Sequence, residues 1–357
     1  MKSIAVFEIN SVDQEHAKVN CGYVRLLSKM DYQVTLVSTL DHANEIKNLD
    51  PELKFEHIDL SKLQSPYLSH SRQIKALGKV FVYYTFKKRF NKLIFLTVTP
   101  LSIIIIKLLG FILAKKLYVV LHSELDKLEK NVGYITILRA LLFPSISRVQ
   151  YIVNHNHIYK KIKNEHIRKK IKVVNLPYMF SDNQNDLVTE KKFCSFGLYS
   201  DDKNSFLICE LAKKVFLKNE DIKIGHVGKV KNPEVYKECR YLDPKPKMDM
   251  ISNEAFQKEL LTSKAILMFP DEKFQYFALS GIILDAINFK TPIISLKSQV
   301  LSELSVEYPG LIFCFETISE MVDAVLKFDV SISNIYLENY RTDWEMKSWS
   351  DLKQLFG

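Results

Sequence analysis

The chain has 357 residues, 47% hydrophobic and 25% charged, with 22 Phe and 17 Tyr, a composition that excludes disordered, collagen-like and disulfide-scaffold proteins. The length is enough for two domains, each with its own core. The net charge of +9 favours anionic partners, such as membrane lipids, nucleic acids or phosphorylated substrates.

The N-terminal half alternates short apolar runs with segments of helical periodicity. We expect strands at residues 3–7, 33–38, 93–97, 117–121, 150–153 and 171–175. Between them we expect helices at residues 21–30, from Pro100 to about residue 114, near 134–142 and near 158–163. This alternation predicts a doubly wound parallel sheet.

A second series of strands and helices follows a polar segment at residues 181–186. It contains expected strands at residues 193–196, 222–227, 265–269 and 292–296, and expected helices at 205–216, 253–261 and 280–288. The sequence therefore predicts an α/β protein with two Rossmann-like, doubly wound domains. They comprise residues 1–180 and 192–332, joined by a linker at 181–191, and one or two C-terminal helices at 333–357 pack back across the domains.

The most informative chemical pattern is the Ser280-Gly281 pair that opens an apolar helix in the second domain. A Ser N-cap, and a Gly that lets a ligand approach the backbone, expose N–H groups at the positive helix end, where a phosphate or diphosphate can bind. Asp285 lies one turn further on the same face, where its carboxylate can accept hydrogen bonds from both hydroxyls of a ribose. An ordinary capped helix with a surface Asp explains the same spacing.

Gly197 ends the first strand of this domain, at the carboxyl edge where open α/β sheets bind ligands. Lys203 is expected to begin the next helix, which is an unfavourable place for a cation unless it faces an anion. A diphosphate held between Lys203 and the Ser280 helix explains both features, although a loop lysine paired with Asp201 or Asp202 explains Lys203 equally well. Neither domain has a Gly-x-Gly-x-x-Gly fingerprint or a P-loop, so we expect no tightly held dinucleotide cofactor.

The order of these segments resembles the GT-B glycosyltransferases that use nucleotide sugars to build bacterial-type cell-surface polysaccharides. Residues 193–204 resemble that group's strand and Gly-Arg–Lys loop. Residues 280–295 resemble its helix of the form Ser-Gly-x-x-x-Asp/Glu-Ala, followed by a Pro-Val-Ile strand that reads Pro292-Ile293-Ile294 here. Residues 119–122 are similar to its strand followed by His, and residues 173–177 to its strand into the interdomain linker, so the resemblance covers nearly the whole chain.

The resemblance implies that the two domains face a cleft and that the C-terminal domain binds a UDP- or GDP-linked sugar as substrate, with no cofactor and no metal. It implies that Lys203 contacts the donor diphosphate, that Asp285 holds the ribose and that His122 touches the transferred sugar. The expected donor-binding residues are Gly197, Lys203, Ser280, Gly281 and Asp285.

Two positions depart from the group's pattern. Leu198 stands where the group usually has an Arg, which removes a phosphate ligand. Phe277 stands where many retaining members have the first Glu of a paired-Glu motif, which leaves the anomeric stereochemistry open.

The loop after the first strand faces the cleft in this architecture and contains four candidate general bases. They are Glu8, Asp13, Glu15 and His16. An inverting reaction needs such a base to deprotonate the acceptor hydroxyl. We favour His16 and Asp13 as catalytic residues because they lie just ahead of residues 20–22, where helix and acceptor loop should meet. His122, which the resemblance places near the transferred sugar, is the third expected catalytic residue. A solvated loop residue, or for His122 a structural histidine at a strand end, is the ordinary alternative.

The excess of positive over negative charge lies entirely in the N-terminal half. Residues 1–180 contain 28 basic and 14 acidic side chains, whereas residues 181–357 contain 22 and 27. Basic clusters at 87–89, 160–163 and 168–172 predict contact with an anionic membrane surface, although a solvated basic face that binds nothing is the plain alternative.

Targeting signals and cysteines bear on the location of the protein. The N-terminal apolar run is too short for a signal peptide, and the apolar stretch at 93–121 is interrupted by Pro100 and three lysines. The five cysteines form no CxxC pair and no metal-ligand spacing, which favours a reducing compartment. We therefore expect a cytoplasmic protein that is peripheral at the inner face of the cell membrane.

These observations predict a metal-independent glycosyltransferase that moves a hexose from a nucleotide diphosphate sugar to a saccharide or lipid-linked acceptor. Three alternatives remain: a nucleotide-sugar epimerase or hydrolase of the same fold, a catalytically silent glycosyltransferase subunit, and a basic nucleic-acid-binding protein. The last is the least favoured and no nucleic-acid partner is expected, because the chain has no zinc-finger spacing, RNP-like motif or recognisable recognition helix.

Overall fold

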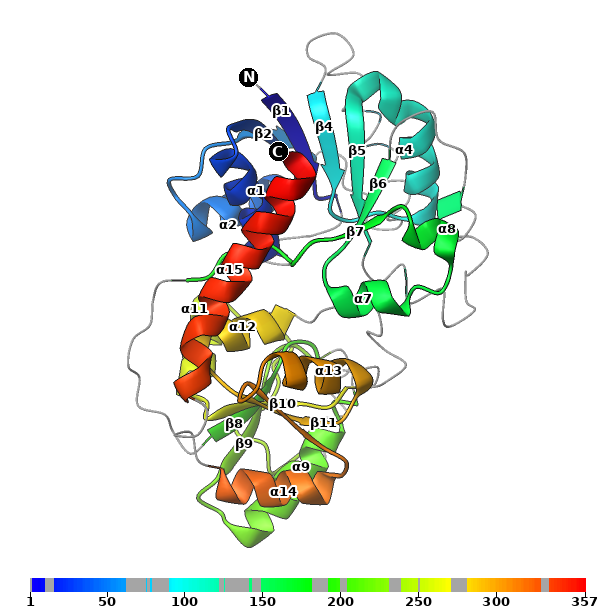
Figure 1. The fold of residues 1–357 in the computed structure, drawn as a ribbon. Coiled ribbons are helices and arrows are strands. Elements are labelled where there is room, and N and C mark those ends of the chain that lie inside the picture. Colours follow the sequence, from blue (N-terminus) through cyan, green and yellow to red (C-terminus); the bar gives the residue numbers. More distant parts are fainter. Residues whose placement is uncertain are drawn as a thin grey trace. The chain divides into compact units, whose positions relative to one another are not determined.

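The chain is described from a computed structural model (Figure 1). It covers residues 2–9, 16–61, 75, 78, 90–121, 125, 141–142, 149–181, 192–199, 204–230, 239–249, 251–270, 281–328 and 334–357, with the backbone alone at 100–101, 109–115 and 334–338. The chain divides into two compact units. Unit 1 comprises Met1–Met179 and Trp344–Gly357, and unit 2 comprises Phe180–Asp343.

Unit 1 contains a sheet of 7 parallel strands with helices between them. In spatial order the strands are β3 (Glu56–Asp59), β2 (Tyr32–Ser38), β1 (Lys2–Phe7), β4 (Phe90–Phe95), β5 (Ala114–Val120), β6 (Val149–Val153) and β7 (Ile171–Val173). The helices are α1 (Ala17–Lys29), α2 (Leu40–Leu49), α4 (Pro100–Leu113), α7 (Asn156–Lys161) and α8 (Glu165–Arg168). Because the strand order reverses between β1 and β4, the ligand crevice expected of an open α/β sheet lies at the carboxyl ends of these two strands.

The last part of helix α15 (Asn334–Phe356) belongs to unit 1. The Trp344 and Phe356 side chains are fully buried, and the Trp344 Nε1–H donates a hydrogen bond of 2.9 Å to the Leu176 carbonyl. At the helix end, the Phe356 carbonyl accepts hydrogen bonds from Lys92 Nζ at 2.6 Å and from the Tyr32 hydroxyl at 2.7 Å. A lysine at this position complements the negative end of the helix dipole.

Unit 2 contains a sheet of 5 parallel strands. In spatial order they are β12 (Ile312–Phe315), β11 (Ile293–Leu296), β10 (Ala265–Met268), β8 (Lys192–Phe196) and β9 (Lys223–Val227). The helices are α9 (Leu207–Lys218), α11 (Asn253–Thr262), α12 (Gly281–Phe289), α13 (Gln299–Glu307) and α14 (Ile318–Lys327). The strand order reverses between β8 and β10, which places the expected crevice of this sheet at their carboxyl ends.

The two parallel sheets confirm the predicted α/β class with two Rossmann-like folds. Most predicted strands and helices are found with ends shifted by one to three residues, as expected for element boundaries. One predicted helix start is wrong and concerns a candidate donor residue. Helix α9 begins at Leu207, four residues after Lys203, because residues 204–206 form a turn with Asn204 at φ 49°.

One pair of cysteines departs from the expectation of unpaired thiols. Cys209 on α9 and Cys239 form a disulfide across a sequence separation of 30 residues. No local motif connects the two residues, so the pairing could not be predicted from a sequence pattern. The Tyr199 hydroxyl lies 3.3 Å from Cys209 Sγ and 3.5 Å from Cys239 Sγ.

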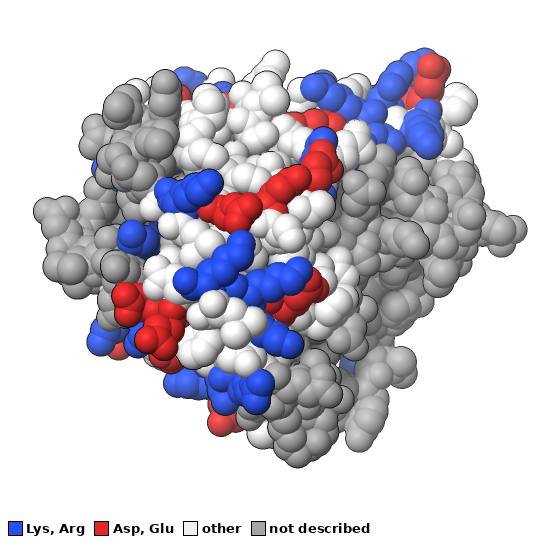
Figure 2. All heavy atoms as spheres, turned by 90° about the horizontal axis from the view of Figure 1, so that it is seen from below, with Lys and Arg blue, Asp and Glu red and all other residues white. Residues whose placement is uncertain are grey.

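The face of unit 2 formed by α9 and α14 has mixed charge. Lys214 pairs with Glu210 at 2.6 Å within α9, and Lys218 pairs with Asp323 of α14 at 3.0 Å. Figure 2, which looks at the molecule from below, shows basic and acidic side chains interspersed on the described part of this face. This mixture suits a solvated surface better than a docking surface for an anionic partner.

Candidate functional site

The first candidate site lies at the switch point of the unit 2 sheet, where the turn after β8 is built from two glycines. Gly197 follows β8 with φ 100°, in the left-handed region, and its N–H donates to the Val227 carbonyl at 3.0 Å. A Cβ placed on Gly228, which follows β9, would lie 1.7 Å from the Gly197 oxygen. Both positions therefore require glycine, because the turns after two neighbouring strands touch through their backbones.

The His226 side chain contacts this turn and helps to hold it in place. Its Nε2 lies 3.0 Å from the Gly197 carbonyl and its Nδ1 lies 2.6 Å from the Ser195 hydroxyl. Its ring also meets the Tyr199 ring edge to face at 5.2 Å. Since a carbonyl can only accept, Nε2 carries a proton. The partners of His226 lie about 30 residues away in the sequence, so no local pattern reveals its role.

Helix α12 begins beside this turn in the topology, after the neighbouring strand β10. Gly281 is its first residue, and a Cβ placed there would meet no atom of the described residues within 4 Å. Asp285, one turn further along the same helix, exposes 7% of its surface. The predicted pair of a helix N-terminus and a carboxylate one turn deeper is therefore present, with no atom of the described residues close to the helix end. The other two predicted donor residues, Lys203 and Ser280, lie outside the described residues.

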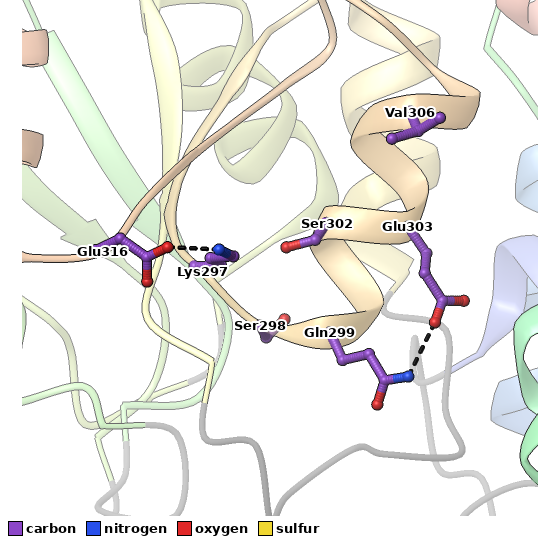
Figure 3. A pocket seen from close by; sticks show the side chains of 7 residues that line it. All are labelled: Lys297, Ser298, Gln299, Ser302, Glu303, Val306 and Glu316. Carbon is purple, nitrogen blue, oxygen red and sulfur yellow. Dashed lines mark hydrogen bonds and ion pairs between the residues drawn. The ribbon is translucent and has the colours of Figure 1, made fainter.

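A cavity of about 530 Å³ opens at the carboxyl ends of the next two strands, β11 and β12. Lys297 and Glu316 follow these strands and face each other as an ion pair in Figure 3, and this pairing raises the pKa of Lys297. The Gln299 side chain donates to Glu303 at 3.0 Å, and the Ser302 hydroxyl points from α13 toward Lys297. This cavity was not predicted from the sequence, because β12 and α13, which line it, were not among the predicted elements.

The second candidate site lies at the switch point of the unit 1 sheet, where a carboxylate is buried. Glu8, the residue after β1, exposes 1% of its surface. Its Oε1 accepts a hydrogen bond of 2.6 Å from the Thr97 hydroxyl, which follows β4, and its Oε2 accepts one of 3.2 Å from Nδ2 of Asn20 on α1. The same Asn20 nitrogen lies 2.8 Å from Nε2 of His42 on α2. Sheet topology thus brings side chains from two strands and two helices to one point.

His16, the first of the predicted catalytic residues, occupies the N-cap of α1 at this same sheet edge. Its φ of 59° is left-handed, and its side chain makes no capping hydrogen bond to the helix. A non-glycine residue in this conformation is strained, and such strain is concentrated at functional sites. Asp13 and His122, the other two predicted catalytic residues, lie outside the described residues.

Comparison with known proteins identifies the fold. No model of a known protein family and no curated protein matches the sequence. Among solved structures, S. aureus MnaA with UDP aligns with a TM-score of 0.62 and 15% identity, over 99% of this chain and 95% of that one. A putative UDP-N-acetylglucosamine 2-epimerase from Listeria monocytogenes aligns at 0.63 and 11%, over 99% and 95%. A TarM variant from S. aureus, in complex with Fondaparinux, alpha-GlcNAc-glycerol and UDP, aligns at 0.57 and 11%, over 100% and 97%.

The chain has the GT-B fold. This confirms the fold named in the sequence analysis, and both glycosyltransferases and epimerases occur among the solved GT-B structures that it resembles. At identities of 11–15% the likeness concerns the fold. The reaction has to be argued from the residues of this chain.

Proposed function

We propose that this chain is a glycosyltransferase that moves a hexose from a nucleotide diphosphate sugar to a saccharide or lipid-linked saccharide acceptor in surface polysaccharide synthesis. The observation that carries the proposal is the start of α12 at the switch point of unit 2. There, no atom of the described residues approaches Gly281, and the buried Asp285 follows one turn later. GT-B proteins of similar structure have been solved with UDP, one of them together with saccharides.

In this proposal the diphosphate lies against the first N–H groups of α12 and the turn at Gly197, and Lys203 supplies a cation. These donors stabilise the negative charge that develops on the leaving diphosphate, which is the main electrostatic demand of the reaction. Asp285 accepts hydrogen bonds from the ribose. The acceptor binds to unit 1, where we propose catalytic roles for His16 and Asp13, and His122 contacts the transferred sugar.

The donor site is tested by a thermal-shift panel of UDP, GDP, CMP and ADP, with and without attached sugars. At 100 times its dissociation constant a ligand adds about 2.7 kcal/mol to the free energy of unfolding. We expect one nucleotide to raise the melting temperature of the wild type, and to raise it less in Lys203→Ala and Asp285→Ala. A wild type that responds to none of the ligands would refute the donor site.

An epimerase is the second candidate, because the Listeria protein of similar structure is described as a UDP-N-acetylglucosamine 2-epimerase. Incubation with UDP-N-acetylglucosamine and no acceptor separates the two activities. An epimerase converts the sugar while it remains linked to UDP, whereas a transferase leaves the donor unchanged or releases UDP to water.

We also propose that unit 1 docks on an anionic membrane surface, at the inner face of the cell membrane. Exposed lysines on α7, between α7 and α8, and after α8 support this: Lys160, Lys163, Lys169, Lys170 and Lys172. In the part of the chain that the structure describes, no helix is both long and apolar enough to cross a bilayer. Co-sedimentation with vesicles tests the docking, because binding should require anionic lipid and weaken with salt. Equal sedimentation with neutral vesicles would contradict it.

A further inference from the structure

The surroundings of the Glu8 carboxyl group supply hydrogen-bond donors. Among the described residues, the Thr97 hydroxyl and the Asn20 amide nitrogen both donate to it. A carboxylate accepts at both oxygens and has no proton to give, whereas a glutamine at this position would turn its own NH₂ group toward one of these donors. The site therefore selects a carboxylate over the amide of the same length. Burial of such a group lowers stability unless the group is hydrogen-bonded, and proteins retain it mainly where it has a chemical use.

Asn20 and His42 hold this carboxylate in position. The Asn20 Nδ2 has two hydrogens, one for Glu8 Oε2 at 3.2 Å and one for His42 Nε2 at 2.8 Å. His42 Nε2 therefore accepts, and its neutral ring carries the proton on Nδ1. His42 is fully buried, and its backbone N–H donates to the hydroxyl of Thr39, which caps α2. A chain of hydrogen bonds thus runs from α2 through α1 to the end of β1.

The Thr97 contact shows how a hydroxyl approaches Glu8. An oxygen-to-oxygen distance of 2.6 Å is typical of a hydroxyl that donates to a carboxylate. A general base has to lie within the same hydrogen-bond distance of the hydroxyl whose proton it removes. The contact lies at the carboxyl ends of β1 and β4, where the strand order of the unit 1 sheet reverses and where ligands of open α/β sheets bind.

We propose that Glu8 is the general base of the transfer reaction, and that Asn20 and His42 are its positioning residues; this assignment rests on the proposed function. The acceptor oxygen forms a bond to the anomeric carbon of the donor sugar. The bond from that carbon to the diphosphate oxygen breaks, and its electron pair leaves with the nucleoside diphosphate. The acceptor's hydroxyl proton moves to Glu8 Oε1, beside or in place of the Thr97 hydroxyl. Proton removal then falls to Glu8, and His16 and Asp13 keep their proposed catalytic roles by binding and orienting the acceptor.

The test compares a nucleophile that needs a base with one that does not. We would measure UDP release from UDP-N-acetylglucosamine, or from whichever nucleotide sugar the thermal-shift panel selects, with glycerol as acceptor and with sodium azide. Glycerol loses a proton when it attacks, whereas azide is already an anion. We expect Glu8→Gln to slow the glycerol reaction at least 100-fold, which is within the usual range for loss of a general base, and to retain the azide reaction.

Two variants keep the test decisive if Glu8→Gln does not fold. His42→Leu removes the acceptor that orients Asn20 and should slow the glycerol reaction through kcat, while the azide reaction and the shift in melting temperature with UDP stay as in the wild type. His57→Leu, at a half-buried histidine of β3 that bonds to Ser38 and lies outside this chain of hydrogen bonds, serves as the matched control. If the Glu8 and His42 variants keep full activity with glycerol, or if they lose both reactions equally, Glu8 is a structural residue and the assignment is wrong.

The failure of the base assignment is distinguishable from failure of the proposed function. A wild type that releases UDP, with variants unaffected, refutes the role of Glu8 alone. A wild type that binds UDP but releases none from the sugar with either nucleophile refutes sugar transfer, and the base role with it.

Discussion

Two glycine-to-alanine variants separate a glycine that the fold needs from a glycine that a ligand needs. At Gly281 an added methyl group would meet no described atom within 4 Å, and the residue begins a helix. Alanine there should leave the protein as stable or raise its stability by up to about 1 kcal/mol, since glycine is the poorer helix former. The same methyl group would occupy the space in which we place the donor phosphate, so affinity for the nucleotide should fall at least 10-fold, about 1.4 kcal/mol.

Gly228→Ala should behave in the opposite way. Its Cβ would lie 1.7 Å from the Gly197 oxygen and 2.6 Å from the Gly197 carbonyl carbon, both backbone atoms. The turns after β8 and β9 would have to separate, at a cost of about 3 kcal/mol. We expect a lower melting temperature, by about 2–4 °C for each kcal/mol in a domain of this size, together with weaker nucleotide binding.

Melting curves and nucleotide titrations of both variants check the reasoning. Normal nucleotide affinity in a folded Gly281→Ala variant would refute the phosphate site at α12. If Gly281→Ala instead unfolds at a much lower temperature, the space at the helix end is not open and the geometric argument fails.

Three further changes test the physical account of the fold. Burial, with smaller contributions from His155 and Lys161, lowers the pKa of His157 from 6.5 to about 3. Because the unfolded chain takes up this proton at higher pH than the folded protein, the free energy of unfolding should fall as pH drops from 6.5 toward 3. In urea unfolding at pH 7 and pH 5, His157→Asn should reduce this pH dependence, and an unchanged dependence would contradict the account. Lys290 ends α12 with φ 52°, and Lys290→Gly should stabilise the protein by about 1 kcal/mol in urea unfolding, whereas a loss would count against strain at this position. Reduction of the Cys209–Cys239 disulfide should lower the free energy of unfolding by about 3–4 kcal/mol, and a melting temperature indifferent to dithiothreitol would show that the pair contributes little.

The elements that the sequence predicts best are those whose signal is local. The strand at residues 3–7 reads as one apolar run because parallel strands are covered on both faces, and in β1 every residue after Lys2 is buried. The spacing of Gly281 and Asp285 is likewise local, since four residues make about one helical turn wherever the helix lies.

Some local signals were present and were not used. Residues 299–328 received no predicted elements, yet they form α13, β12 and α14. Helix α14 begins with a capping box in which the Thr317 side chain accepts from the Glu320 N–H and the Glu320 carboxylate accepts from the Thr317 N–H. A Thr followed three residues later by a Glu, ahead of an apolar run, is a readable start signal for a helix.

Other features depend on contacts that no window of sequence contains. Glu8 was one of four candidate bases in a loop, behind His16 and Asp13, until Thr97, 89 positions away, was found beside it. His226 gains its role from the Ser195 hydroxyl, 31 positions away. In both cases the sheet joins the partners, because the carboxyl ends of neighbouring parallel strands meet at one edge however long the connection between them is.

The two switch points have opposite hydrogen-bonding character, and this difference matches the two halves of the proposed reaction. In unit 2 the backbone N–H groups at the start of α12 donate, and negative charge develops on the departing diphosphate. In unit 1 the Glu8 carboxylate accepts, and a proton leaves the attacking hydroxyl. A protein that only bound nucleotide would need the first feature and would gain nothing from a carboxylate held in place by Asn20 and His42. The buried Glu8 is therefore the feature that favours a catalyst over a silent subunit, and the comparison of glycerol with azide tests this distinction directly.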